Sequence, residues 1–403
     1  MNRALAATAA SLVALGAVAA EDDTDFAASK GSPLEAQLRQ RLEAAIRTIP
    51  GTDTQYLIGG YLQVDGIASR KKQDGDEQNT FIVSTTPFGP ANSDYVLSVR
   101  QSTFDTLTRT PTSLGEVWTR LDVNLFPLDG RTALNLNQLY VRLGDWLIAG
   151  KTYTSFMDED ALPTTLDYNG PSGVTFVRQW LARGAIPFGS GWSLAASVEE
   201  SQADLEGGGA LFSARTEARR PDLAARVRYE GDFGHVQLAA LSRSIDVTVE
   251  SASGTRDRHV NGTGVSLSGS LNIFGARSLL WQAVTGKGVG RYFNDPLSAT
   301  GVALGSDLRL ELVRSSGLTL YYQHKWTPNW MTVAGASTLW VSTDGFRQPD
   351  ELRRVVYASA NLIHRLTPTL IVGAELLWGE ATRVDGTSAT NARVQLSVRY
   401  LVF

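Results

Sequence analysis

The chain has 403 residues and no cysteine, which excludes disulfides, thiol catalysis and cysteine-ligated zinc. Its few histidines lie far apart, without metal-ligand spacing, at His235, His259, His324 and His364. No Gly-x-Ser-x-Gly motif marks a nucleophile. Beyond residue 20 no apolar run reaches about 18 residues, so the sequence has no transmembrane helix. We therefore expect no enzyme activity, no catalytic residue, no metal and no cofactor.

Lysine is also scarce, since the 37 basic residues include only six lysines. The net charge of −4 argues against nucleic acid as a partner. Arginine keeps its charge and binds carboxylate or phosphate through two parallel hydrogen bonds. An excess of arginine therefore suits a pore that passes anions, although a GC-rich genome produces the same bias.

The first 20 residues have the pattern of a secretory signal peptide, with Arg3 followed by an apolar run from Ala4 to Val18. Residues 21–51 form a separate N-terminal segment. Ser32-Pro33 provides an N-cap and a proline at the first helical position, which predicts a helix over Leu34–Ile49. We expect this short periplasmic helix to pack on a second copy of itself or on the end of the following domain.

From residue 54 onward about sixteen strand-length segments alternate apolar and polar residues. In Trp192–Glu199 and in Val394–Tyr400, every second residue is apolar. A hydrophobic content of 43% with mean hydropathy −0.11 is low for a helical membrane protein. These values suit a barrel whose strands present one face to lipid and the other to water. A soluble sandwich produces the same alternation with its apolar face inward.

The connections distinguish these two folds, because short turns alternate with long polar loops. The long loops are expected at about 69–93, 154–173, 200–221, 248–262, 287–316, 343–353 and 380–391. Outer-membrane barrels have tight periplasmic turns and long extracellular loops. The sequence thus predicts an all-β fold, a 16-stranded antiparallel transmembrane β-barrel over residues 52–403 with a short N-terminal periplasmic helix. It further predicts a location in the bacterial outer membrane, in contact with its lipid, with both termini periplasmic.

Several motifs resemble the DcaP-like trimeric outer-membrane porin family. They are Gly150–Asp158, Leu162–Tyr168, Gly170-Pro171, Arg178-Gln179, Thr108–Gly115 and Tyr322–Asn329. The resemblance implies a homotrimer that takes up small anions such as organic or dicarboxylic acids. The chain departs from the family at Asn135 and Asn137, where basic residues are usual, and at Thr103, which follows Ser102 in place of arginine. Part of the family's basic set is therefore missing.

The parity of each strand predicts which side chains line the pore and set its selectivity. These candidates are Arg100, Arg120, Asp122, Asn135, Asn137, Lys151, Arg178, Arg226, Arg228, Arg243 and Lys325. The long loop Phe156–Gly173 is expected to fold inward as a constriction. Its acids are Asp158, Glu159, Asp160 and Asp167, which we expect to face Arg120, Arg178 or Arg226. A charge at a strand end is equally consistent with a rim residue that has no effect on transport.

Together these features predict a passive diffusion porin for small hydrophilic solutes, with a preference for small anions. Two other classes stay open. A secreted β-rich binding protein would share the signal peptide and the alternation. An outer-membrane barrel hydrolase would need a serine and a histidine in contact, and the sequence shows no motif that brings such a pair together.

Overall fold

The computed structural model describes residues 46–402 except 76–77, 128–129, 203–204, 208–211, 252–253, 274–276, 296–300, 306–308 and 344–346. β-Strands make up nearly all of its regular structure. They are β1 (Arg47–Thr48), β2 (Gln55–Ser69), β3 (Asp94–Ser98), β4 (Thr103–Thr112), β5 (Gly115–Asn124), β6 (Asn135–Leu143), β7 (Leu147–Tyr153), β8 (Arg178–Phe188), β9 (Trp192–Glu199), β10 (Leu205–Gly207), β11 (Phe212–Glu217), β12 (Asp222–Gly231), β13 (Gly234–Ser251), β14 (Gly254–Asn272), β15 (Arg277–Lys287), β16 (Val302–Leu304), β17 (Leu310–Leu312), β18 (Arg314–Thr327), β19 (Trp330–Val341), β20 (Leu352–Thr367), β21 (Leu370–Arg383) and β22 (Ser388–Leu401). The short 3-10 helices are η2 (Val83–Thr85), η3 (Glu159–Ala161) and η4 (Gly290–Tyr292).

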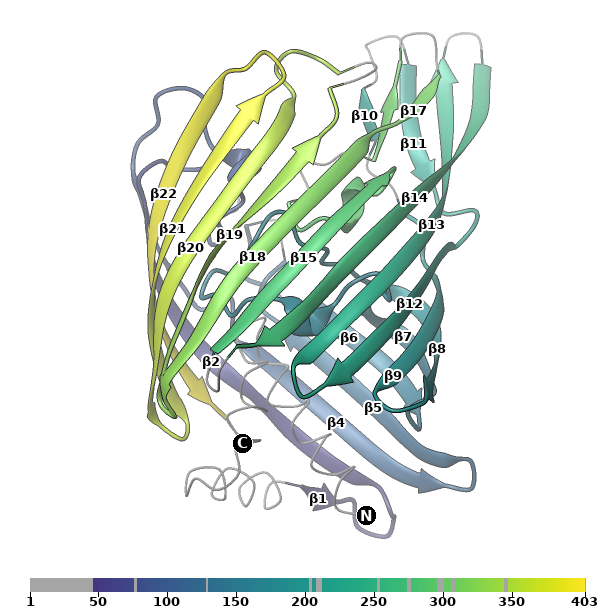
Figure 1. The fold of residues 1–403 in the computed structure, drawn as a ribbon, viewed down its shortest axis with the longest axis vertical. Helices are drawn as coiled ribbons and strands as arrows, with labels where there is room; N and C mark the ends of the chain where they lie inside the picture. Colours follow the sequence, from purple (N-terminus) through teal and green to yellow (C-terminus); the bar gives the residue numbers. More distant parts are fainter. Residues whose placement is uncertain are drawn as a thin grey trace.

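The main sheet closes on itself, because β2 pairs antiparallel with β22 from Tyr61↔Leu401 to Ser69↔Arg393. Two positions in the barrel wall are each filled by two consecutive strands. β3 and β4 both pair with β2, and β11 and β12 both pair with β13. The result is a closed antiparallel barrel of sixteen strands, as the sequence predicted (Figure 1).

The barrel wall is uneven in height. Strands β4 to β9 are short, between 7 and 11 residues, whereas β13, β14 and β18 to β22 have 12 to 19 residues. The tall wall rises above the short one (Figure 1). We call the end of the barrel where β2 stops and β22 starts the upper end, as it is drawn in Figure 1. β1 and the last residues of β22 lie at the lower end.

The predicted alternation is confirmed along the strands. In β9 the side chains of Trp192, Leu194 and Val198 are exposed on the outside, whereas Ala195 and Ser197 between them are buried. Burial on the inside of a barrel reflects contact with loops or neighbouring side chains. No helix among the described residues is long and apolar enough to cross a membrane.

The structure corrects the expected loops, and it leaves most of the predicted helix and the signal peptide outside the described residues. The long loops expected at 248–262 and 380–391 are strand hairpins, since β13 pairs with β14 up to Ser251↔Gly254 and β21 pairs with β22 up to Thr382↔Ser388. In β13 the outward residues Ser244, Asp246 and Thr248 are polar here, whereas Ile245, Val247 and Val249 between them belong to a second buried apolar cluster. The predicted helix Leu34–Ile49 lies outside the described residues up to position 45, and residues 47–48 form β1. The signal peptide also lies outside the described residues.

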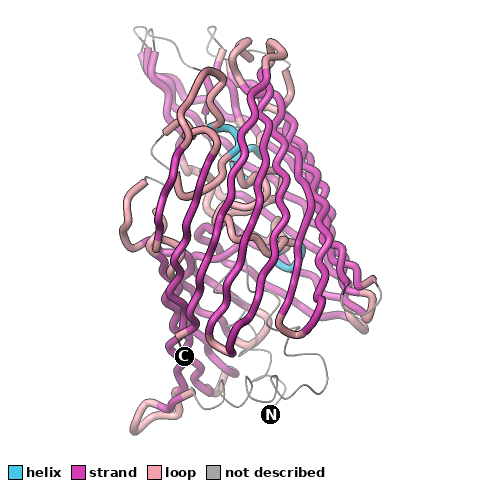
Figure 2. The backbone as a smooth tube through the Cα atoms, turned by 90° about the vertical axis from the view of Figure 1, so that its left-hand side faces the viewer, coloured by secondary structure: helices cyan, strands magenta, loops and turns pink. Residues whose placement is uncertain are grey.

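Part of the barrel interior is filled by connecting segments (Figure 2). Phe81 and Val83 from the segment after β2, Phe156 from the loop after β7, and Tyr292 from the segment after β15 belong to one buried apolar cluster. The cluster includes inward side chains of the tall wall, among them Tyr321, Val333, Leu339, Val355 and Tyr357. The tall wall therefore packs against protein on its inner face.

Candidate pore constriction

The segment between β7 and β8, residues 154–177, lies inside the barrel, and we call it the lumen loop. Its apolar side chains are almost completely buried, with Phe156 and Met157 at 0% exposure and Leu166 at 4%. The ring of Phe156 meets that of Tyr292 edge-on, with 5.7 Å between centroids. Burying one such side chain contributes about 1.5–3 kcal/mol, so these residues hold the loop inside the barrel.

Polar groups of the tall wall hold the middle of the lumen loop. The carboxylate of Glu375 on β21 accepts hydrogen bonds from the backbone N–H groups of Leu166 (2.8 Å) and Asp167 (2.7 Å). The side-chain amide of Gln395 donates to the Leu166 carbonyl over 2.6 Å, and that of Asn361 donates to the Thr164 carbonyl over 2.8 Å. Since β7 and β8 belong to the short wall, these bonds fasten the loop across the barrel.

The start of the lumen loop is fastened through Asp158. Its carboxylate is hydrogen-bonded to the His235 ring (2.9 Å) and the Ser268 hydroxyl (2.7 Å), and it forms an ion pair with Arg228 (3.2 Å). Burial raises the pKa of Asp158, but the bond to His235 and the positive charges outweigh it, and the net pKa is lowered. The neighbouring Asp160 also pairs with Arg228, over 2.5 Å.

The acids of the lumen loop thus face other partners than the sequence suggested. Asp158 and Asp160 meet Arg228, not Arg120 or Arg178. Asp167 accepts hydrogen bonds from the Phe81 and Gly170 backbone and from the Tyr357 hydroxyl, and burial raises its pKa. The four acids do not form one exposed carboxylate face.

Glu159 interacts with the positive charge of a predicted arginine, Arg226. Burial raises the pKa of its carboxyl, while the positive charges of Arg183 and Arg226 lower it in part. Glu159 and Asp158 are both close enough to Arg226 to interact with its charge.

Other segments brace the lumen loop. The backbone N–H of Asn294 donates to the Val174 carbonyl over 3.0 Å, and that of Phe176 donates to the Tyr292 carbonyl over 2.9 Å. Asp295 accepts hydrogen bonds from Ser84 and Ser172. The segments after β2, β7 and β15 are therefore joined to one another as well as to the wall.

Among the predicted pore-lining arginines, several are neutralised by carboxylates. Arg120 donates from two nitrogens to Asp105, at 3.1 and 2.8 Å, and also contacts Asp122 at 3.4 Å. Arg243 pairs with Asp222 over 2.8 Å and donates to the Gly288 carbonyl. Arg228 is paired as described above. Arg120 and Arg243 are 1% exposed, so they support the packed interior and contribute little free positive charge to an open lumen.

No carboxylate among the described residues lies within ion-pair distance of Arg178, Arg183 or Arg226, which surround the start and end of the lumen loop. Arg183 donates to the Tyr153 carbonyl over 3.2 Å. Lys151 does not join these arginines, because its register partners Leu139 and Trp180 are exposed on the outer face, so it faces outward and not, as predicted, into the pore. The three arginines are half-buried and belong to β8 and β12. We call them the cation set.

Aromatic rings hold Arg178 in place. Its guanidinium carbon lies 5.6 Å from the centroid of Tyr153 and 5.2 Å from that of Phe176, and the Tyr168 hydroxyl is 3.4 Å from one nitrogen. The Tyr168 ring stacks on Phe126 with centroids 3.8 Å apart. These contacts orient the charge without cancelling it.

The remaining predicted residues are placed as follows. Arg100 is buried over the Phe126 ring, 4.2 Å from its centroid. Asn135 donates to Asn124 and Asn137, and Asn137 donates to Asp122. Lys325 is half-buried near the lower end of β18, on the tall wall. The roles of all predicted site residues in transport stay predictions.

Sequence reasoning missed three residues that shape this region. Asp105 neutralises Arg120, Arg183 joins the cation set, and His235 binds Asp158. All three have inward parity, and this signal was available from the alternation of their strands. Asp158, Asp160 and His235 lie close enough together to share a metal ion, but the Arg228 guanidinium already supplies positive charge to both carboxylates.

His235 also contacts a serine, which the sequence gave no reason to expect. The Ser270 hydroxyl is 3.0 Å from one ring nitrogen of His235, and Asp158 is 2.9 Å from the other. This chain of serine, histidine and aspartate has the composition of a hydrolase triad. However, Asp158 is also bonded to Ser268 and Arg228, as expected for a residue that anchors a loop.

Comparison with known proteins supports the architecture. The family model described as the porin subfamily matches residues 48–392. A crystal structure of the outer membrane channel DcaP of Acinetobacter baumannii aligns with TM-score 0.79 and 16% identity, over 89% of this chain and 100% of that chain. An anion-selective porin from Comamonas acidovorans aligns with TM-score 0.57 and 12% identity, over 87% and 100%. OmpT of Vibrio cholerae in a trimer form aligns with TM-score 0.51 and 10% identity, over 86% and 99%. No curated protein matches the chain.

Proposed function

The chain belongs to the porin subfamily, and from that premise we propose a channel of the bacterial outer membrane that passes small hydrophilic solutes by diffusion and prefers anions. Transport has no chemical step. Selectivity comes from the width left beside the lumen loop and from the charges on the wall that faces it.

One observation carries the anion preference. The lumen loop and its bracing segments pack on the tall wall, and the cation set lies on the short wall and β12, without ion pairs among the described residues. The other inward arginines at this level, Arg120, Arg228 and Arg243, are paired with acids. A solute that passes the lumen loop therefore meets an excess of positive charge.

The solute class follows from the same geometry. Guanidinium groups bind carboxylates through parallel hydrogen bonds, so organic acids, including dicarboxylic acids, are the first solutes to test. One similar solved structure is described as an anion-selective porin, which supports the direction of the preference. Asn135 and Asn137 contribute no charge, so we expect the preference to be mild.

We further propose a homotrimer, in keeping with the trimer form described for a similar barrel. Residues 1–20 would be removed as a signal peptide, residues 21–51 would lie in the periplasm, and residues 52–403 would form the barrel. β2 starts and β22 ends at the lower end, so this end faces the periplasm in the proposed orientation. The long connections of the upper end then face outward.

The test is the reversal potential of the purified protein in a planar bilayer under a KCl gradient. An anion-selective potential is the expected result. A cation-selective potential would overturn the anion preference and leave the channel intact, and the absence of conductance would overturn the channel itself.

A second candidate function, a lumen hydrolase, is favoured only by the contact between Ser270 and His235. A fluorophosphonate probe applied to the wild-type protein and to Ser270→Ala tests it. We expect no labelling of either protein, because Asp158 is occupied by Arg228 and Ser268. Labelling that disappears in Ser270→Ala would establish a reactive serine.

A further inference from the structure

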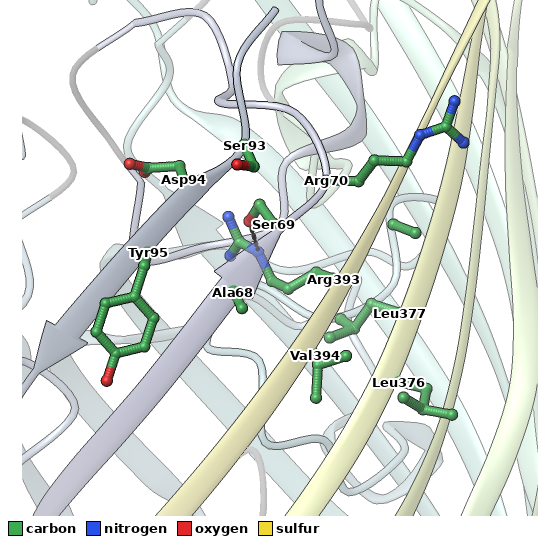
Figure 3. A pocket seen from close by; sticks show the side chains of 11 residues that line it. Ala68, Ser69, Arg70, Ser93, Asp94, Tyr95, Leu376, Leu377, Arg393 and Val394 are labelled. Carbon is green, nitrogen blue, oxygen red and sulfur yellow. Dashed lines mark hydrogen bonds between the residues drawn. The ribbon is translucent and has the colours of Figure 1, made fainter.

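An open furrow runs along the outer face of the barrel beside the upper end of β2. A cavity of about 740 Å³ opens there, lined from β3, β2, β22 and β21 (Figure 3). By strand register, Tyr95, Ala68, Val394 and Leu376 form one row across these four strands. All four side chains are exposed, and Ala68 is the smallest of them. The furrow therefore has Ala68 as its floor and larger apolar side chains as its walls.

The furrow continues toward the lower end of β2. Two residues further along the same face comes Gly66, which pairs with Leu97 on one side and Leu396 on the other. Leu97 is 68% exposed and Leu396 is 58% exposed. A floor of Ala68 and Gly66 between walls of leucine, valine and tyrosine gives a narrow apolar channel on the outside of the wall.

Positive charge lies at the upper end of the furrow. Arg70 has the same parity as Ala68 and Gly66, lines the cavity, and is exposed. Among the described residues its guanidinium makes no hydrogen bond or ion pair, and Asp94, also at the rim, extends away from it (Figure 3). Lys71 and Lys72 follow directly, so two of the six lysines adjoin this arginine. Lys71 donates to the Pro87 carbonyl, whereas Lys72 is exposed.

We propose that this furrow binds one membrane lipid with a phosphate-bearing headgroup. The acyl chain lies over Ala68 and Gly66, and the phosphate meets Arg70 and Lys72. The proposal rests on the proposed function, because it requires the outer face of the barrel to lie in a bilayer. Cations beside an apolar surface attract anionic lipid, and arginine pairs with phosphate through two hydrogen bonds. The cavity has the size of ordinary ligand sites, about 300–1,000 Å³.

A second copy of the chain is the competing occupant. It would have to insert a narrow apolar ridge and place an acid beside Arg70. The furrow is narrow, ends in a basic cluster and follows the strand direction, which suits a single chain with an anionic head better than a broad protein surface.

The test uses the full-length protein, delipidated in mild detergent and titrated with phosphatidylglycerol or with phosphatidylcholine of the same acyl chains. Native mass spectrometry counts the lipid retained. We expect preferential retention of phosphatidylglycerol, a reduction of about fivefold in Arg70→Gln, and loss of the preference in Ala68→Phe, which fills the furrow. Arg314→Gln and Ala225→Phe alter exposed outward residues of other strands, β18 and β12, and should match the wild type.

Equal retention of both lipids, or equal retention by wild type and both furrow variants, would overturn the lipid site. Dissociation of the oligomer in Ala68→Phe, without a change in lipid retention, would assign the furrow to a second copy instead. Bilayer conductance of the same preparations separates this proposal from the proposed function. Normal conductance without lipid preference refutes only the furrow site, and absent conductance in the wild type refutes the channel.

Discussion

Replacing two members of the cation set, Arg178→Gln with Arg226→Gln, should reduce the anion preference of the channel. Glutamine keeps a polar side chain of similar reach and removes the charge. Arg178 contacts aromatic rings and a tyrosine hydroxyl, and Arg226 has no ion pair among the described residues. The double variant breaks no ion pair of the described residues, and Glu159 keeps the positive charge of Arg183 when that of Arg226 is removed, so we expect the barrel to fold normally.

The expected magnitude follows from the position of the charges. In a water-filled lumen, a unit charge about 8 Å from a passing ion contributes about 0.5 kcal/mol, and salt at about 0.1 M reduces this by about half. Two charges together then change the relative free energy of chloride and potassium by about 1 kcal/mol, because the effects on the two ions have opposite sign. The ratio of chloride to potassium permeability should fall about fivefold.

The assay is the reversal potential in a KCl gradient, measured for wild type, the double variant and Arg314→Gln. Arg314 lies on the outward face of β18 and controls for a change in net charge. An unchanged potential in the double variant, with normal conductance, would show that the cation set does not control selectivity. An equal shift in Arg314→Gln would assign the effect to overall charge.

Three further predictions concern the lumen loop. In Glu375→Gln the amide oxygen can still accept from Leu166 and Asp167, but the amide NH2 group then faces the Asn361 donor and the acceptor loses its charge. This costs about 1–3 kcal/mol of anchoring and should give larger, noisier single-channel currents. Asp158→Asn removes the ion pair with Arg228 and should lower the temperature at which the oligomer dissociates on gels, while Asn272→Asp, outside the loop contacts, should not. A Cβ at Gly173 would overlap the Thr338 carbonyl, so Gly173→Val should displace the loop and increase the conductance, and an unchanged conductance would contradict the loop's role as the constriction.

The barrel could be predicted from the sequence because its main determinant is local. Alternation at Trp192–Glu199 gives the lipid face directly, since successive side chains of a strand point to opposite sides. The loops at 248–262 and 380–391 were misjudged because the outward face of a strand becomes polar beyond the apolar band, as at Asp246 and Thr248, while the ladder bonds continue. Apolar outward residues therefore mark the part of a strand that faces lipid, and they do not show where the strand ends.

Pairing between inward charges could not be read from one strand at a time. Arg120 and Asp105 lie on neighbouring strands, where Leu107 is the register partner of Arg120 and Asp122 that of Asp105. The diagonal neighbour, not the direct partner, neutralises the arginine. A list of inward arginines therefore overstates the free charge of the lumen, and the ion pairs decide which of them reach a solute.

The route of the lumen loop had a signal in the sequence of the opposite wall. In β20, Val355 and Tyr357 are apolar and face inward, as do Val333 on β19 and Leu377 on β21. An inward face that met only water would have no reason to be apolar. Strands that are apolar on both faces therefore mark where connecting segments pack. Arg183 and Arg226, by contrast, face inward without an ion pair among the described residues, and the proposed route for solutes runs past them.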